Sequence, residues 1–167
     1  MESPKRIPPS KELIDDIVDI IVFLHKSIGD LTEVNPKGIR ELSGLEHAAF
    51  EIIKLLSNPK TDPINVGVKI LNLLVKRHYF WDANKRIGYI FAKSILDGFY
   101  NLHLKINYEN AEKFLLRLAD ETKHVTDEET TQWLKTCVAP LSAEEKRRLL
   151  DEDFRYMSSK FKKRNGN

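Results

Sequence analysis

The chain has 167 residues, 41% hydrophobic and 31% charged, which allows one domain with a sizeable core and excludes two domains of ordinary size. Its formal net charge of +2 is too small to indicate nucleic acid or an anionic membrane as a partner. No apolar run reaches the length of a membrane span, and MESPKRIPPS lacks the apolar core of a secretory signal, so we expect a cytoplasmic protein without a membrane partner. The single Cys137 excludes an internal disulfide and a cysteine-based zinc site, and we expect it to be buried.

The first helix is predicted from Lys11 to Ser27, where apolar residues recur at helical spacing, and Gly29 is expected to end it. A loop or short hairpin should follow in the segment GDLTEVNPKGIRELSG, which contains turn-forming residues and no sustained period.

Two further helices are predicted before residue 78. The spacing of Ser43 and Glu46 matches a capping box at the start of the second helix. The third helix should begin with Asp62 as the N-cap and Pro63 in the first turn, and its apolar positions continue to about Arg77.

The second half of the chain continues with helices. Apolar residues between 87 and 95 follow the spacing of a core-facing helix, and Gly98 is expected to terminate it. Asn107 is the expected N-cap of the next helix, and Thr126 with Glu129 matches a capping box for the one after. Six or seven helices with short connections predict an all-α bundle with any strand limited to one short hairpin.

Residues 139–167 differ in composition from the rest of the chain. Ser142 and Glu145 match a capping box for a final charged helix. The chain ends with the basic residues Lys160, Lys162, Lys163 and Arg164. We interpret this part as a solvated helix and a frayed end, with a contact to nucleic acid or another partner as the alternative.

The stretch HYFWDANKRIG, residues 78–88, concentrates polar groups where the fourth helix begins, with Asp82 or Asn84 as its expected N-cap. The first N–H groups of a helix have no partners within it, and the helix dipole makes this end partly positive, so it favours an anion. Lys85 and Arg86 lie in the same first turn, where their charges oppose the dipole. Two cations become favourable there if a polyanion binds, so the sequence predicts a phosphate site.

Two other residues in the stretch suit phosphate chemistry. Asp82 could hold the Mg²⁺ that accompanies a triphosphate, and its spacing agrees equally well with a role as a helix cap. His78 could accept a proton from a hydroxyl nucleophile, because histidine is the side chain that most readily exchanges a proton near neutral pH, although a lone histidine is more often structural. Phe80 is expected to hold the loop to the core.

The sequence HYFWDANKR resembles the signature of the Fic/Doc family, H-x-F-x-[DE]-[GA]-N-[GK]-R, without interruption from His78 to Arg86. The segments LHKSIG and GIRELSGLEHAAFE are also similar to the corresponding parts of Doc-type members. The likeness covers roughly Leu13 to Val138. It implies a Fic/Doc-like helical bundle, with a catalytic domain at 1–138 and a charged helix and basic tail at 139–167.

Within the family the chain is most similar to Doc (death-on-curing) toxins. AMP-transferring members resemble H-x-F-x-[DE]-G-N-G-R-x-x-R, whereas this chain has Ala83, Lys85 and Tyr89 at the two glycines and the last arginine. The Doc pattern D-A-N-K-R implies a kinase that presents the γ-phosphate of ATP to a Ser or Thr hydroxyl of a target protein. Adenylyl transfer, and a non-catalytic binding module on the same scaffold, are the alternatives.

The resemblance implies a role for each residue of the motif. His78 would be the general base, and Asp82 the carboxylate associated with Mg²⁺. The backbone around Ala83 and the residues Asn84, Lys85 and Arg86 would bind the phosphates of ATP, with Lys85 and Arg86 also stabilising charge during transfer.

The resemblance also implies partners. Gly38, Ile39 and Arg40 match the flap that positions the target chain, which in Doc is translation elongation factor Tu. Many members carry or borrow an inhibitory helix with the pattern [ST]-x-x-x-E-[GN]. The nearest segment here, Glu109-Asn110, has Lys105 where Ser or Thr is required. Restraint would then need an antitoxin that supplies this helix, unless the tail or low activity suffices.

Four histidines lie outside the motif. His25 occupies a position where Doc-like chains often have a histidine, so a supporting or capping role is open to it. His47, His103 and His124 have no metal-ligand spacing, and we interpret them as surface or satisfied core residues.

Overall fold

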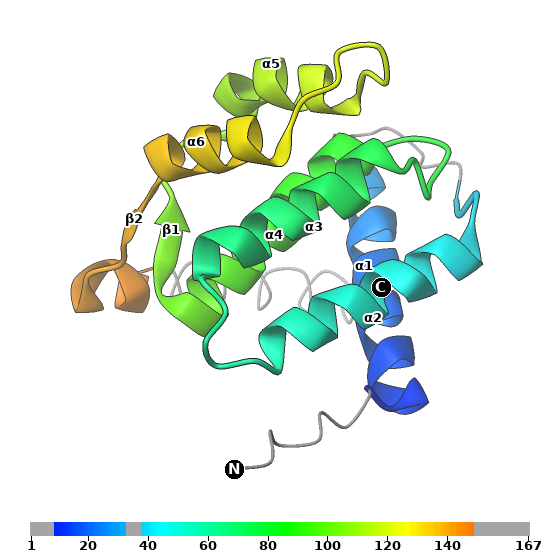
Figure 1. Cartoon of the computed structure of the whole chain (residues 1–167), viewed down its shortest axis with the longest axis horizontal. Coiled ribbons are helices and arrows are strands. Elements are labelled where there is room, and N and C mark those ends of the chain that lie inside the picture. The colour runs from blue at the N-terminus through cyan, green and yellow to red at the C-terminus, as the bar shows by residue number, and fades with distance from the viewer. Residues whose placement is uncertain (1–8, 33–37, 149–167) are drawn as a thin grey trace, which may run out of the picture.

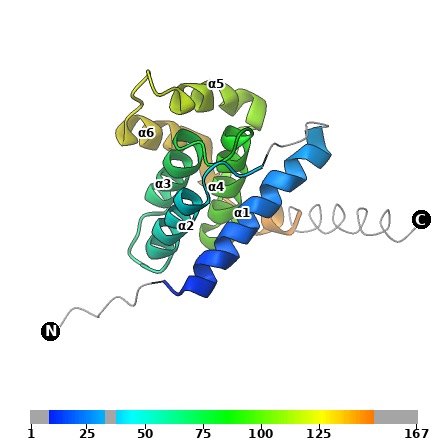
Figure 2. The same ribbon diagram turned by 90° about the vertical axis from the view of Figure 1, so that its right-hand side faces the viewer.

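The centre of the computed structural model, which describes residues 9–32 and 38–148, is a pair of helices, α3 and α4 (Figure 1). Helices α1 and α2 pack on one side of this pair, and α5 and α6 on the other (Figure 2). The helices are α1 (Lys11–Thr32), α2 (Leu42–Leu56), α3 (Pro63–Lys76), α4 (Asn84–Tyr100), α5 (Tyr108–Ala119) and α6 (Asp127–Cys137), followed by helical residues 143–148. The predicted all-α bundle of six or seven helices is confirmed.

Helices α3 and α4 can pack closely because α4 has a glycine at the contact. A Cβ atom on Gly88 would lie 2.5 Å from Cγ2 of Val75, a fully buried residue of α3. Gly67 of α3 lies equally close to Leu134 of α6, where an added Cβ would come within 2.6 Å of Cδ2. The contact of Gly88 with Val75 fixes the position of α4 against α3, and therefore the position of the first turn of α4.

A two-stranded antiparallel sheet joins the end of α4 to the end of α6. Strand β1 (Leu102–Leu104) pairs with β2 (Val138–Pro140), with His103 opposite Ala139. The two strands are separated in sequence by α5 and α6, so this sheet is not the hairpin considered for residues 29–44. Residues 33–37 of that segment lie outside the described residues.

Two glycines predicted to end helices do not end them. Helix α1 continues past Gly29 to Thr32, and α4 continues past Gly98 to Tyr100. A Cβ atom built on Gly98 would meet no described atom within 4 Å outside the backbone of its own helix, so packing does not require a glycine at this position. The residue that ends α4 is Asn101, which is left-handed (φ 53°) and donates its backbone N–H to the Leu96 carbonyl. Asparagine tolerates this conformation better than most residues.

Most predicted caps are confirmed. The side chains that accept backbone N–H groups at helix starts belong to Asp62, Asn107, Thr126 and Ser142, the last two in reciprocal bonds with Glu129 and Glu145. The capping box at Ser43 and Glu46 is wrong, because α2 begins earlier, at Leu42, with Glu41 as its N-cap. Pairing of residues 38–41 with the loop before α4 sets this earlier start.

Two further expectations concern Cys137 and the chain end. Cys137 is buried, as predicted, and burial raises the pKa of its thiol. The basic tail, Lys160 to Arg164, lies outside the described residues. Among the helices that the structure describes, none has both the length and the apolar character needed to cross a membrane.

Candidate functional site

Asn84 folds the loop 78–83 back onto the start of α4. Its Oδ1 accepts the backbone N–H of Phe80 at 3.0 Å, and its Nδ2 donates to the Phe80 carbonyl at 2.8 Å. Asn84 and Phe80 are both buried, so these two bonds satisfy backbone groups that water cannot reach. The amide of Asn84 is therefore engaged in the loop, and its backbone N–H is the group that remains for an anion in the first turn.

Ala83, and not Asp82 or Asn84, is the N-cap of α4. It is left-handed, with φ 62° and ψ 4°. This conformation costs a residue with a Cβ about 1–2 kcal/mol. The turn at Ala83 reverses the chain between the loop and the helix, so the predicted side-chain cap is replaced by a backbone turn.

Asp82 contacts the first helix. One carboxylate oxygen lies 3.2 Å from Nε2 of His25, a residue of α1 that is 2% exposed. The same imidazole is stacked on the Phe80 ring, with centroids 4.3 Å apart and planes 13° from parallel. Phe80 is buried, as predicted. The Asp82 side chain is 29% exposed, which leaves it accessible to a hydrated cation.

His78 adopts an uncommon backbone conformation and contacts α5. Its φ is 51°, and such strain in a residue other than glycine is frequent at functional sites. Its Nε2 lies 3.2 Å from the Ala119 carbonyl. Because a carbonyl oxygen only accepts, Nε2 carries the hydrogen in this contact, and Nδ1 is the ring nitrogen that can accept a proton.

Arg86 contacts the other end of α5. Its guanidinium interacts with the hydroxyl of Tyr108, whose pKa is raised above its ordinary value by burial and by Glu112, with Arg86 partly offsetting the rise. Tyr108 and Ala119 are the first and last residues of α5, about 16 Å apart at about 1.5 Å per residue. The His78 imidazole and the Arg86 guanidinium are therefore held toward opposite ends of this helix.

Lys85 differs from Arg86 in its surroundings. It is half-buried in the first turn of α4. Within residues 9–32 and 38–148, no hydrogen bond or ion pair holds its ammonium group. Lys85 is thus a cation at a positive helix end without a compensating side chain, as the sequence indicated.

The predicted flap residues lie beside the loop. Ile39 forms an antiparallel bridge with Phe80. The Trp81 N–H donates to the Gly38 carbonyl at 3.2 Å, and the Arg40 N–H donates to the Tyr79 carbonyl at 2.7 Å. Gly38 has φ 96°, a conformation open mainly to glycine.

Outside this bridge, the two segments also meet through side chains. The Arg40 guanidinium lies over the Trp81 ring, 5.6 Å from its centroid. Trp81 itself is 62% exposed, an unusual position for so large an aromatic side chain. The structure thus brings Gly38, Ile39 and Arg40 together with the motif.

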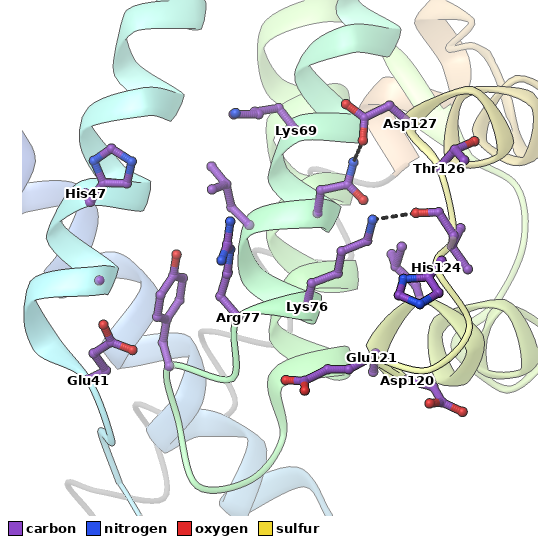
Figure 3. Close-up of a pocket in the computed structure, with 17 residues that line it drawn as sticks. Glu41, His47, Lys69, Lys76, Arg77, Asp120, Glu121, His124, Thr126 and Asp127 are labelled. Atoms are coloured by element: carbon purple, nitrogen blue, oxygen red, sulfur yellow. Dashed lines mark hydrogen bonds between the residues drawn. The ribbon is translucent and has the colours of Figure 1, made fainter.

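A groove of about 1000 Å³ lies on the neighbouring face, across α3 between α2 and the connection from α5 to α6. Figure 3 shows His47 of α2 on one side of it and His124 and Asp127 on the other. Tyr79 and Ala119 also line it, so the groove adjoins the loop. Its charged residues are the basic Lys69, Lys76 and Arg77 and the acidic Glu41, Asp120, Glu121 and Asp127. This balance favours no single class of charged ligand.

Sequence reasoning missed the groove and Tyr108, because both depend on how α5 packs and no local pattern encodes that. His103 is satisfied by Asp97, 2.9 Å away, in agreement with its predicted structural role. Across the described part of the chain, no three His, Cys, Asp or Glu side chains converge to form a metal site by themselves.

Comparisons with protein-family models, with curated proteins and with solved structures found no match for this chain. A function is therefore inferred from the motif, its local geometry and the chemistry of its side chains.

Proposed function

We propose that this protein is a Doc-like enzyme of the Fic/Doc type that transfers the γ-phosphate of ATP to a Ser or Thr hydroxyl of a target protein. One observation carries the proposal. The nine residues that match, HYFWDANKR, include a loop with residues in the left-handed conformation, and Asn84 holds this loop by two hydrogen bonds to Phe80. The helix that follows has the cations Lys85 and Arg86 in its first turn. A motif retained only for packing has no need of two cations in the first turn of a helix, where the helix dipole opposes them.

The first turn of α4 would bind the phosphates. Backbone N–H groups at Asn84 and Lys85 suit phosphate oxygens, and the Lys85 ammonium adds a point charge. The Arg86 guanidinium, which interacts with the Tyr108 hydroxyl, would add a second positive charge beside the same anion.

Asp82 would hold the Mg²⁺ of the nucleotide. Mg²⁺ binds one or two carboxylates together with phosphate oxygens and water, so a single exposed carboxylate next to a phosphate site fits it. The metal would neutralise charge on the phosphates.

His78 would act as the general base through Nδ1. The target hydroxyl gives its proton to Nδ1 as its oxygen bonds to the γ-phosphorus, and the bond from that phosphorus to the β,γ-bridging oxygen breaks. ADP is the leaving group, and the products are a phosphorylated side chain and a protonated imidazole that returns its proton to solvent. The contact with Ala119 would hold the ring orientation during this step.

Two residues favour phosphate transfer over AMP transfer. Lys85 stands where adenylyl-transferring relatives have the glycine that admits the α-phosphate. Tyr89 stands where they have a second arginine, and it is buried with its hydroxyl bonded to the Ile106 carbonyl. Neither residue supplies what an α-phosphate would need.

A non-catalytic binding module is the second candidate, and one observation favours it. The His78 and Arg86 side chains contact opposite ends of α5, and a catalytic pair must converge on one phosphate. In a binding module, a partner protein would dock on the edge formed by Gly38, Ile39, Arg40 and the exposed Trp81, and no reaction would follow.

The leading proposal, a Doc-like kinase, also includes a target, a place of action and a means of restraint. The target would be elongation factor Tu or its equivalent, which places the reaction in the cytoplasm, and Gly38, Ile39 and Arg40 would align the target chain. An antitoxin that supplies an inhibitory helix would restrain the activity.

Labelled ATP tests the proposal. Protein incubated with Mg²⁺ and a bacterial extract should transfer label from [γ-³²P]ATP and not from [α-³²P]ATP to a protein band. His78→Ala should abolish the transfer, and His47→Ala, a change at an exposed histidine on α2, should not. Label from the α position would replace kinase with adenylyltransferase, and no label from either would favour the binding module.

A further inference from the structure

His25 is a buried polar side chain that the proposed reaction does not use directly. It lies on α1, far in sequence from the motif, and only 2% of it is exposed. Burial of an imidazole is costly unless its polar atoms are satisfied, and a leucine at this position would fill the core more cheaply. Among the described residues, its ring stacks on Phe80 and its Nε2 lies within hydrogen-bond distance of Asp82, and both partners belong to the loop 78–83.

The two contacts hold Phe80 and Asp82, which are two residues apart in the loop 78–83. Phe80 forms a single antiparallel bridge with Ile39, and residues 81 and 82 form a bend directly after it. Phe80 and Asp82 face α1 and meet the same ring, one by stacking and the other by a hydrogen bond. Trp81, between them, faces solvent. The ring therefore contacts both the aromatic side chain that anchors the loop and the Asp82 carboxylate.

The hydrogen bond has a defined direction. A carboxylate oxygen can only accept, so the imidazole donates from Nε2. A donor that is fixed in the core favours one orientation of the carboxylate that accepts from it.

We propose that His25 is a positioning residue that orients the Asp82 carboxylate for Mg²⁺–nucleotide, an inference that rests on the proposed function. His25 itself touches neither metal nor nucleotide. Removal of the Nε2 donor should weaken metal binding even when the aromatic contact with Phe80 is kept. Groups that orient a metal-binding side chain typically change metal affinity by about 10–100-fold when they are removed.

Two substitutions separate the hydrogen bond from the stacking. His25→Phe keeps an aromatic ring for Phe80 and removes the donor. His25→Gln removes the ring and keeps an N–H donor at a similar reach from the backbone. Asp82→Asn is the reference for loss of the carboxylate. Mg²⁺ is titrated calorimetrically into each protein in the presence of a non-hydrolysable ATP analogue, and Tm is measured in parallel.

We expect His25→Phe to weaken Mg²⁺ binding by about 10-fold or more, and His25→Gln to stay within about threefold of the wild type. A purely structural role predicts changes in Tm for both variants without this difference in Mg²⁺ affinity. If His25→Phe lacks the circular dichroism of a folded protein, the smaller His25→Leu takes its place with the same expectation.

The remaining outcomes decide against the inference in distinguishable ways. Wild-type Mg²⁺ affinity in His25→Phe, with loss of binding in Asp82→Asn, would overturn the positioning role and leave the proposed function intact. Equal weakening in His25→Phe and His25→Gln would also overturn it, since the donor would then be irrelevant. Unchanged binding in Asp82→Asn would refute the metal role of Asp82, and the inference would fall with that part of the proposed function.

Discussion

Substitution of Asn84 by alanine should destabilise the protein far more than the loss of an exposed asparagine side chain would. The change removes two hydrogen bonds to the Phe80 backbone, at 3.0 Å and 2.8 Å. Each bond contributes about 1 kcal/mol net, and each buried group left without a partner adds a penalty of about 1–3 kcal/mol. Partial relaxation of the loop offsets some of this, so we expect the free energy of unfolding to fall by about 2–4 kcal/mol.

Urea denaturation followed by circular dichroism measures this loss. At an m-value of about 2 kcal/mol per molar, the midpoint should fall by about 1–2 M. The matched control is Asn58→Ala, which removes one exposed bond to the Lys60 N–H and should change stability by less than about 0.5 kcal/mol. If the two variants were equally stable, the asparagine of the motif would not be the latch of the loop.

Two further predictions concern α4. Gly88→Ala should lower the free energy of unfolding by about 1–3 kcal/mol, because the new Cβ meets Val75. Gly98→Ala should raise it by about 0.5–1 kcal/mol, because alanine favours a helix more than glycine does and the new Cβ has room. Equal effects of the two substitutions in urea denaturation would contradict the close contact of α3 with α4. Burial raises the pKa of Tyr89 to about 12 from 10.0, so its contribution to stability is complete below pH 10 and is lost as the pH rises through about 12. The difference in ultraviolet absorbance between wild type and Tyr89→Phe should show this phenol ionising near pH 12, and ionisation near pH 10 would mean that it is not buried.

Local signals predicted the helices and most of their caps. Asp62 and Thr126 bond to N–H groups within their own first turns, so a few residues of sequence contain all the information. The failures came where distant segments meet. The start of α2 depends on a bridge between residue 39 and Phe80, which overrides the capping pattern at Ser43.

The candidate site also combines residues that the local sequence predicted with contacts that it did not predict. The motif identified Asp82, Lys85 and Arg86 because their chemistry and spacing are local. Contacts that the sequence could not indicate come from the packing of α5 and α1, which places Tyr108 beside Arg86 and the ring of His25 beside Asp82. No hydrophobic period specifies which polar side chains meet across two packed helices.

Mass spectrometry of the modified target is the most direct test of the central claim, that this protein phosphorylates a protein hydroxyl. Extract treated with the wild-type protein and ATP should yield one or more peptides that carry a phosphate on Ser or Thr, absent after treatment with His78→Ala. Peptides that carry AMP, or phosphopeptides that persist with His78→Ala, would contradict the account.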